Sequence, residues 1–207
     1  MTVAQQERAA LVATFREITP DAPTLCEGWD ARDMAAHLVI RERRLDAAPG
    51  ILIPALADYT ERVQRQVSAS TDWDTLVDQV ASGPPLYSPL KLLDSVANVA
   101  EMFIHHEDIR RAQPGWEPRP LDDRTTAALG RPVAMMTRMT LRNAPAKVIL
   151  RTPQGKTLAT AGHGEPVTVT GDPGELLMFA AGRNEFRVTF DGSADLVDRV
   201  RTSRGGL

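Results

Sequence analysis

Apolar residues in the first half of the chain recur at intervals of three and four positions, which predicts amphipathic helices with short connections. A capping box of Thr2 and Gln5 opens the first helix, and Pro20 ends it. Four main helices of this kind favour a bundle. The expected helices after the first are about 31–48, capped by Asp30; about 54–67, with Pro54 in its first turn; a short one capped by Thr71 with Asp74 and reaching Val80; and a long one capped by Ser88, with Pro89 at its first position.

The pattern changes after residue 112. Segment 113–120 contains three prolines and a glycine, which marks a boundary. A helix is then expected from Asp122 or Asp123 to about 141, with Pro132 interrupting or restarting it. Apolar and polar residues alternate beyond it, as in half-buried strands: the expected later elements are strands 147–152, 156–160, 166–170 and 186–191, a helix over 172–181, and a last helix capped by Ser193. The predicted fold class is a helical bundle over 1–112, a linker over 113–121 and a small α+β domain over 122–207.

Composition narrows the function classes. The chain of 207 residues is 43% hydrophobic and 25% charged, as in an ordinary globular protein. Its net charge of −3 gives no electrostatic case for binding nucleic acid or an acidic membrane. No segment has the length of apolar sequence that a membrane span requires, the N-terminus lacks signal-peptide features, and a single cysteine fits a reducing compartment, so a cytoplasmic location is expected.

Candidate chemistry lies in the long helix, where Glu101 and His105 are four residues apart and therefore share one face. At about 100° per residue, His105 falls near 40° from Glu101 and Asp108 near −20°, whereas His106 is about 140° away and cannot share an ion with Glu101. This stripe borders the apolar face. An alternative interpretation is that it is the solvated face of an amphipathic helix.

His37 is a third candidate ligand, on a helix face that a bundle turns inward. Two imidazole nitrogens and one carboxylate oxygen form a common set for catalytic Zn²⁺, and the same set can hold Fe²⁺, Ni²⁺ or Mn²⁺. The alternative is a hydrogen-bonded core histidine. A chain without any metal would place His37 too far from Glu101 to share an ion.

Two motifs carry a resemblance to a known family. The segment 25–38, with Gly28-Trp29 followed by Asp33-x-x-x-His37, and the later Glu101-x-x-x-His105 resemble the DinB-like metal-binding four-helix bundle of the mycothiol-dependent maleylpyruvate isomerase family. The resemblance implies that His37, Glu101 and His105 hold zinc. Segment 167–183 is similar to the small, sterol-carrier-like C-terminal domain that accompanies this bundle.

The resemblance also implies a chemistry. Mycothiol, a low-molecular-weight thiol, would bind as a thiolate at the metal and attack a small electrophilic substrate, in an isomerase or a thiol transferase. Arg183 is the candidate catalytic residue, because its planar fork suits a substrate carboxylate; a salt bridge is its alternative role. The other candidate function is a non-catalytic metal-binding protein that senses or sequesters a small molecule.

Two further residues near these motifs remain open. Asp108 either orients a ligand or is solvated. Cys26 has no activating group nearby in the sequence, so we expect a small buried residue.

Overall fold

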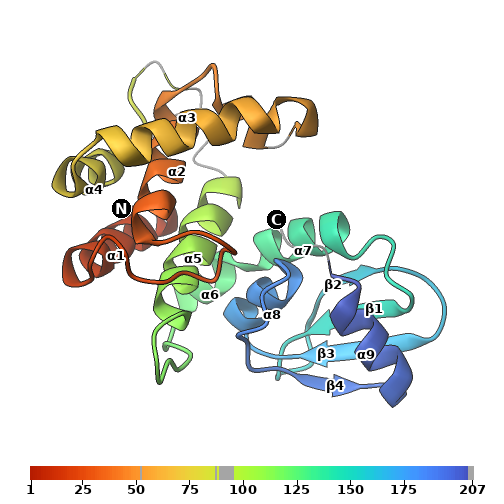
Figure 1. The fold of residues 1–207 in the computed structure, drawn as a ribbon. Helices are drawn as coiled ribbons and strands as arrows, with labels where there is room; N and C mark the ends of the chain where they lie inside the picture. Colours follow the sequence, from red (N-terminus) through yellow and green to blue (C-terminus); the bar gives the residue numbers. More distant parts are fainter. Residues whose placement is uncertain (52, 87, 89–95, 205–207) are drawn as a thin grey trace. The chain divides into compact units, whose positions relative to one another are not determined.

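The computed structural model describes all residues except 52, 87, 89–95 and 205–207. The chain forms two compact units, Met1–Trp116 and Glu117–Leu207. The first is mostly helical, and the second contains a four-stranded sheet with helices (Figure 1). The predicted fold class is therefore confirmed.

The described helices of the first unit begin and end where local signals place them. Thr2 and Gln5 form the expected capping box, and Asp30 accepts a hydrogen bond from the Asp33 amide at 2.9 Å. The elements are α1 (Val3–Glu17), α2 (Ala31–Arg43), the 3₁₀ turns η1 (Ala48–Ile51) and η2 (Pro54–Leu56), α3 (Ala57–Ser70), α4 (Trp73–Ser82) and α5 (Val96–Arg111).

Two expected helix ends in this unit are wrong. α2 stops at Arg43 rather than near residue 48, because the backbone of Arg44 leaves the helical region with φ −112° and ψ 81°, and two 3₁₀ turns follow. Leu45 is consequently 47% exposed. α4 is capped by Asp72, whose carboxylate accepts from the Thr75 amide at 3.0 Å, and not by Thr71 with Asp74.

Ser88 is buried, but residues 89–95, where the long helix is expected to begin, lie outside the described residues, and the described part of this helix begins at Val96. Proline at 54 sits in η2, and α3 starts only at Ala57. None of the helices in the described parts of the chain has the length and hydrophobicity needed to cross a bilayer.

Side chains of α1, α2, α4 and α5 share one hydrophobic core. α1 packs against α4 and α5, and α2 packs against α3 and α4. The Arg8 guanidinium of α1 pairs with Glu42 of α2 and donates to the Val80 carbonyl of α4 at 2.8 Å. The buried members of this core include Leu11, Phe15, Met34, Leu38, Leu76, Met102 and Ile109.

The second unit follows the predicted sequence of elements. α6 ends at Ala128 and α7 restarts at Gly130, with Pro132 in the first turn of α7, where a missing amide proton costs nothing. The sheet order is β2-β1-β3-β4; β1 is antiparallel to β2 and parallel to β3, and β3 is antiparallel to β4. The elements are α6 (Asp123–Ala128), α7 (Gly130–Thr140), β1 (Lys147–Arg151), β2 (Thr157–Ala161), β3 (Pro166–Thr170), α8 (Pro173–Ala180), β4 (Thr189–Asp191) and α9 (Ala194–Thr202).

The alternation of apolar and polar residues that predicted the strands points one face of the sheet inward. Val148 lies opposite Val167 and Leu150 opposite Val169, and all four are fully buried. The last strand is shorter than the expected 186–191, because the Arg187 amide donates to the Glu175 carboxylate at 2.6 Å instead of entering the ladder.

Candidate metal centre

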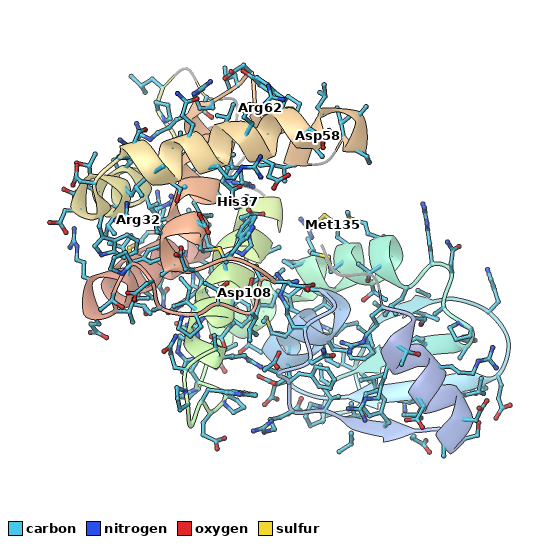
Figure 2. All side chains as sticks on the ribbon, viewed as in Figure 1. Arg32, His37, Asp58, Arg62, Asp108 and Met135 are labelled. Carbon is cyan, nitrogen blue, oxygen red and sulfur yellow. The ribbon has the colours of Figure 1, made fainter. Side chains whose placement is uncertain are left out.

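Two helices of the first unit bring the predicted ligands together. α2 carries His37 on its inward face, where only 7% of the residue is exposed. α5 carries Glu101 and His105 one turn apart. Figure 2 labels His37 on α2 and Asp108 on α5. Asp108 follows His105 by three residues, about one helical turn.

The three candidate ligands meet at one carboxylate oxygen. Glu101 Oε1 lies 3.2 Å from His37 Nε2 and 3.3 Å from His105 Nε2. All three ligand atoms fall within 4.8 Å of one another. The alternative without a metal expected His37 to lie too far from Glu101 to share an ion. That expectation is wrong.

These distances fit a metal ion. Tetrahedral bonds of about 2.0–2.1 Å place neighbouring ligand atoms about 3.3 Å apart, which matches both measured separations. The solvated-face interpretation does not fit, because the side chains of Glu101 and His105 are only 21% and 12% exposed.

The protonation states of the site follow from burial and neighbouring charges. Burial lowers the pKa of His37, so a neutral imidazole with a free lone pair is favoured. Burial opposes ionisation of Glu101, but hydrogen bonds with His105 and His37 and the charge of Arg41 outweigh it and hold the pKa of the carboxyl well below its ordinary value. A carboxylate and a neutral imidazole are the forms that bind metal.

Asp108 contacts the His105 ring nitrogen that does not face Glu101. Its Oδ2 lies 3.0 Å from His105 Nδ1, and the residue is fully buried, so the solvated alternative for Asp108 is wrong. Burial lowers the pKa of His105, but hydrogen bonds with Asp108, Cys26 and Glu101 reverse this effect and raise the pKa well above its ordinary value. A carboxylate at Nδ1 fixes the ring and directs Nε2 toward the other ligands.

Arg41 also belongs to this site, although we did not predict it from the sequence. Its Nε lies 3.3 Å from Glu101 Oε1, and its NH2 donates to Asn98 Oδ1 at 3.1 Å. The signal that points to it is its spacing: Arg41 follows His37 by four residues, as His105 follows Glu101.

Comparison with known proteins places this chain in a family. The family model for the N-terminal domain of mycothiol maleylpyruvate isomerase matches residues 2–142. The chain belongs to the mycothiol maleylpyruvate isomerase family. A comparison with curated proteins gave no match.

Solved structures share the fold at low sequence identity. A crystal structure of mycothiol-dependent maleylpyruvate isomerase is similar with a TM-score of 0.63 and 15% identity, over 91% of this chain and 90% of that chain. A histidine-to-alanine mutant of that isomerase gives a TM-score of 0.59 and 14% identity over the same shares. The isomerase fold therefore extends over both units of the chain.

His106 and Cys26 also lie near the candidate ligands, but they make different contacts. His106 turns toward α1, with Nε2 3.0 Å from Thr14 Oγ1 and Nδ1 3.5 Å from Glu7, as its angle on the helix predicted. Cys26 is half-buried, and its Sγ donates to Asp108 Oδ2 at 3.4 Å. The expectation of an inert buried cysteine missed this contact, because sequence spacing does not show which loop meets α5.

Arg183 lies in the second unit, just after α8, and is 8% exposed. Its NH1 donates to the Ala181 carbonyl at 3.1 Å, and its amide donates to the Met178 carbonyl at 3.1 Å. A role for Arg183 in substrate binding stays a prediction.

Proposed function

We propose that this member of the family is a metal-dependent, thiol-using enzyme: a mycothiol-dependent isomerase or transferase that acts on a small electrophilic molecule, with zinc as the metal. The observation that carries the proposal is the convergence of His37 Nε2 and His105 Nε2 on Glu101 Oε1 at 3.2 and 3.3 Å. Family membership supports the thiol, because mycothiol stands in the family's description.

His37, Glu101 and His105 would hold the metal in this proposal. When bound, the metal would supply Lewis acidity that stabilises a thiolate at neutral pH. Asp108 would accept the Nδ1 proton of His105, and metal binding would displace the Nε2 proton that the raised pKa of this ring favours. Arg41 balances the negative charge of Glu101, so the site retains enough positive charge to attract an anionic thiolate.

The reaction class follows from thiol chemistry. The thiolate sulfur would form a bond to an electrophilic carbon, and a proton would reach the adjacent carbon. In an isomerase, rotation about the new single bond precedes loss of the same proton and thiolate; in a transferase, the carbon–sulfur bond remains. For a substrate with a carboxylate, we propose that Arg183 binds both carboxylate oxygens through its guanidinium.

Elemental analysis of the full chain, purified without chelator, tests the metal site. We expect about one equivalent of zinc in the parent and its loss in His37→Ala, since that variant lacks one of three ligands. His163→Ala is the matched control, because His163 is an exposed histidine distant in sequence from all three ligands, and it should keep the metal.

Absence of metal from the parent, even after zinc or nickel is offered, would contradict the proposal. Metal retained in His37→Ala would contradict the ligand set. With metal present, turnover of an electrophile by added mycothiol separates the enzyme from a non-catalytic metal-binding protein, which would show none.

A further inference from the structure

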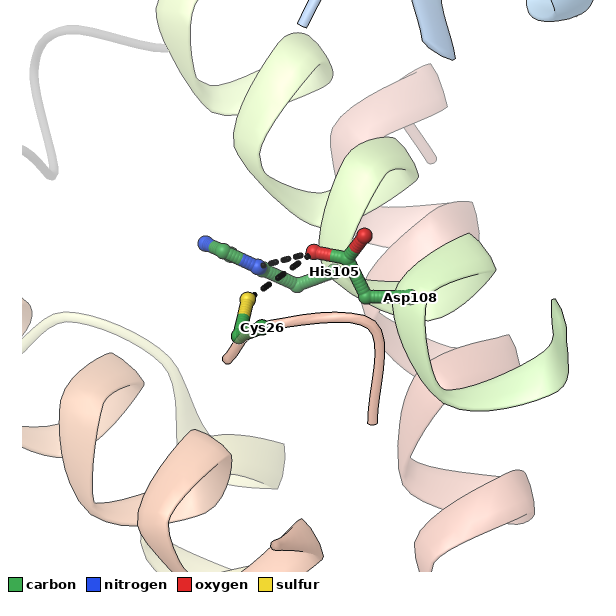
Figure 3. A group of neighbouring side chains, drawn as sticks. All are labelled: Cys26, His105 and Asp108. Atoms are coloured by element: carbon green, nitrogen blue, oxygen red, sulfur yellow. Dashed lines mark hydrogen bonds and ion pairs between the residues drawn. The ribbon is translucent and has the colours of Figure 1, made fainter. Parts of the chain in front are cut away.

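Cys26, His105 and Asp108 form a second group of side chains of types that can bind metal, on the opposite side of the His105 ring from Glu101. Asp108 Oδ2 is 3.0 Å from His105 Nδ1 and 3.4 Å from Cys26 Sγ. Figure 3 shows both contacts as dashed lines. The three ligand atoms lie within 4.8 Å of one another. This group shares only His105 with the centre described above.

The separations fit a tetrahedral ion with a sulfur ligand. Bonds of about 2.3 Å to sulfur and about 2.0 Å to oxygen or nitrogen place sulfur about 3.5 Å from oxygen, and nitrogen about 3.3 Å from oxygen. The measured values of 3.4 and 3.0 Å are close to these. Small adjustments of side chains would therefore suffice.

Main-chain hydrogen bonds hold the cysteine beside α5. The Leu25 amide donates to the carbonyl of Asp108 itself at 3.0 Å, and the Trp29 amide donates to the Cys26 carbonyl at 3.0 Å. Thr24 Oγ1 closes the same loop by donating to the Trp29 carbonyl at 2.9 Å. The position of Cys26 is thus built into the fold.

We propose that Cys26, His105 and Asp108 bind a thiophilic divalent cation, such as cadmium, and that this position and the His37–Glu101–His105 position exclude each other. A thiolate ligand favours soft ions, and the first position has no sulfur. Magnesium, which prefers oxygen ligands, should bind at neither position.

The exclusion follows from the protons of one imidazole. A neutral ring has one lone pair. With Nε2 bound to metal, Nδ1 carries the proton and donates it to Asp108; with Nδ1 bound to metal, Nε2 carries the proton and donates it to Glu101 Oε1, 3.3 Å away. Cys26 releases its thiol proton to solvent when it binds, as metal-binding thiols do.

Cadmium titration of the full chain in the absence of any added thiol tests the proposal. Cys26 is the only cysteine in the sequence, so an ultraviolet cadmium–thiolate charge-transfer band reports on it alone. We expect the band to reach its plateau at about one cadmium per chain. Cys26→Ser should abolish the band, and His37→Ala should keep it, because His37 belongs only to the first position.

Further variants separate the proposed site from simpler explanations. Asp108→Asn and His105→Gln should each weaken the band-forming affinity by at least about tenfold, since even outer-shell partners contribute about 10- to 100-fold. Circular dichroism would verify that each variant is folded. A band in the parent that persists in both variants and saturates at half an equivalent would indicate a cysteine pair between two chains and overturn the proposal.

Two other results would also overturn it. A folded parent without the band would remove the site, and a second equivalent bound by the parent would remove the exclusion. The proposal stands apart from the proposed function: a parent that holds no zinc yet gives the band would contradict only the function, and a zinc-loaded parent whose metal-free form gives no band would contradict only this inference.

Discussion

Asp108 is the residue on which both candidate positions depend. One of its oxygens contacts the His105 ring and the Cys26 thiol, and its backbone carbonyl accepts the Leu25 amide. A buried carboxylate with several partners acts on metal affinity through the ligands that it orients. Its effect on zinc can therefore be measured separately from the three proposed ligands.

Asp108→Asn should weaken zinc binding by about 10- to 100-fold, because a neutral amide holds the His105 proton less firmly at Nδ1. A titration against a chelator of known affinity would measure the change. Asp74→Asn, at an exposed carboxylate, should leave zinc affinity unaltered. Equal affinity of the parent and Asp108→Asn would show that this hydrogen bond does not support the site.

Sequence spacing at this scale revealed residues that share a helix, but few contacts between elements. The four-residue interval predicted that Glu101 and His105 share a face, the inward helix face suggested His37 as a third ligand, and the family motifs supported all three. The contact of Arg41 with Glu101 and the contact of Cys26 with Asp108 escaped prediction. The contact of Cys26 depends on how the loop before α2 approaches α5, which local spacing does not encode. Arg41, by contrast, follows His37 by four residues, and this spacing places both on one face of α2.

Among the elements, α4 gives the sharpest test of helix capping. Asp72→Ala should lower the free energy of unfolding measurably, since its carboxylate accepts from the Thr75 amide at 3.0 Å. Thr71→Ala should cost less than about 0.5 kcal/mol, as for surface changes away from such features. Urea unfolding would compare the two. A larger loss of unfolding free energy for Thr71→Ala than for Asp72→Ala would show that Thr71 caps α4, as expected from the sequence.

Most described elements were predictable because their periodicity is strong. The strands β1, β2 and β3 coincide with the alternating segments, and Pro132 does separate α6 from α7. The errors are at ends, as in α2 and β4. The backbone of Arg44 leaves the helical conformation after α2, and a competing hydrogen bond to Glu175 shortens β4; neither is visible in hydrophobic spacing.

For the whole molecule, all ligands of the proposed metal lie in the unit Met1–Trp116. Zinc should therefore stabilise that unit by mass action, by about 2.7 kcal/mol when free zinc is 100 times its dissociation constant. Calorimetry with zinc and with chelator should show a higher unfolding temperature with zinc. His37→Ala should show no such shift, and an equal shift in that variant would point to binding elsewhere.

The overall order of the two units was also predictable, because the change from helical to alternating periodicity after residue 112 is abrupt. The boundaries 1–112, 113–121 and 122–207 stay a prediction at that level of detail. The family model passes through this region to residue 142, so it includes α6 and α7 of the second unit. The end of the family model and the boundary between the two compact units therefore lie at different residues.

The hydrogen bond from the Leu25 amide to the Asp108 carbonyl has an evolutionary consequence. Because it joins main-chain atoms, a change of side chain at position 26 leaves the loop in place beside α5. Descendants of this sequence can therefore exchange sulfur for oxygen or carbon at that position by a single mutation, without rebuilding the scaffold. If the proposed site binds metal, its metal preference can therefore change without a change of fold.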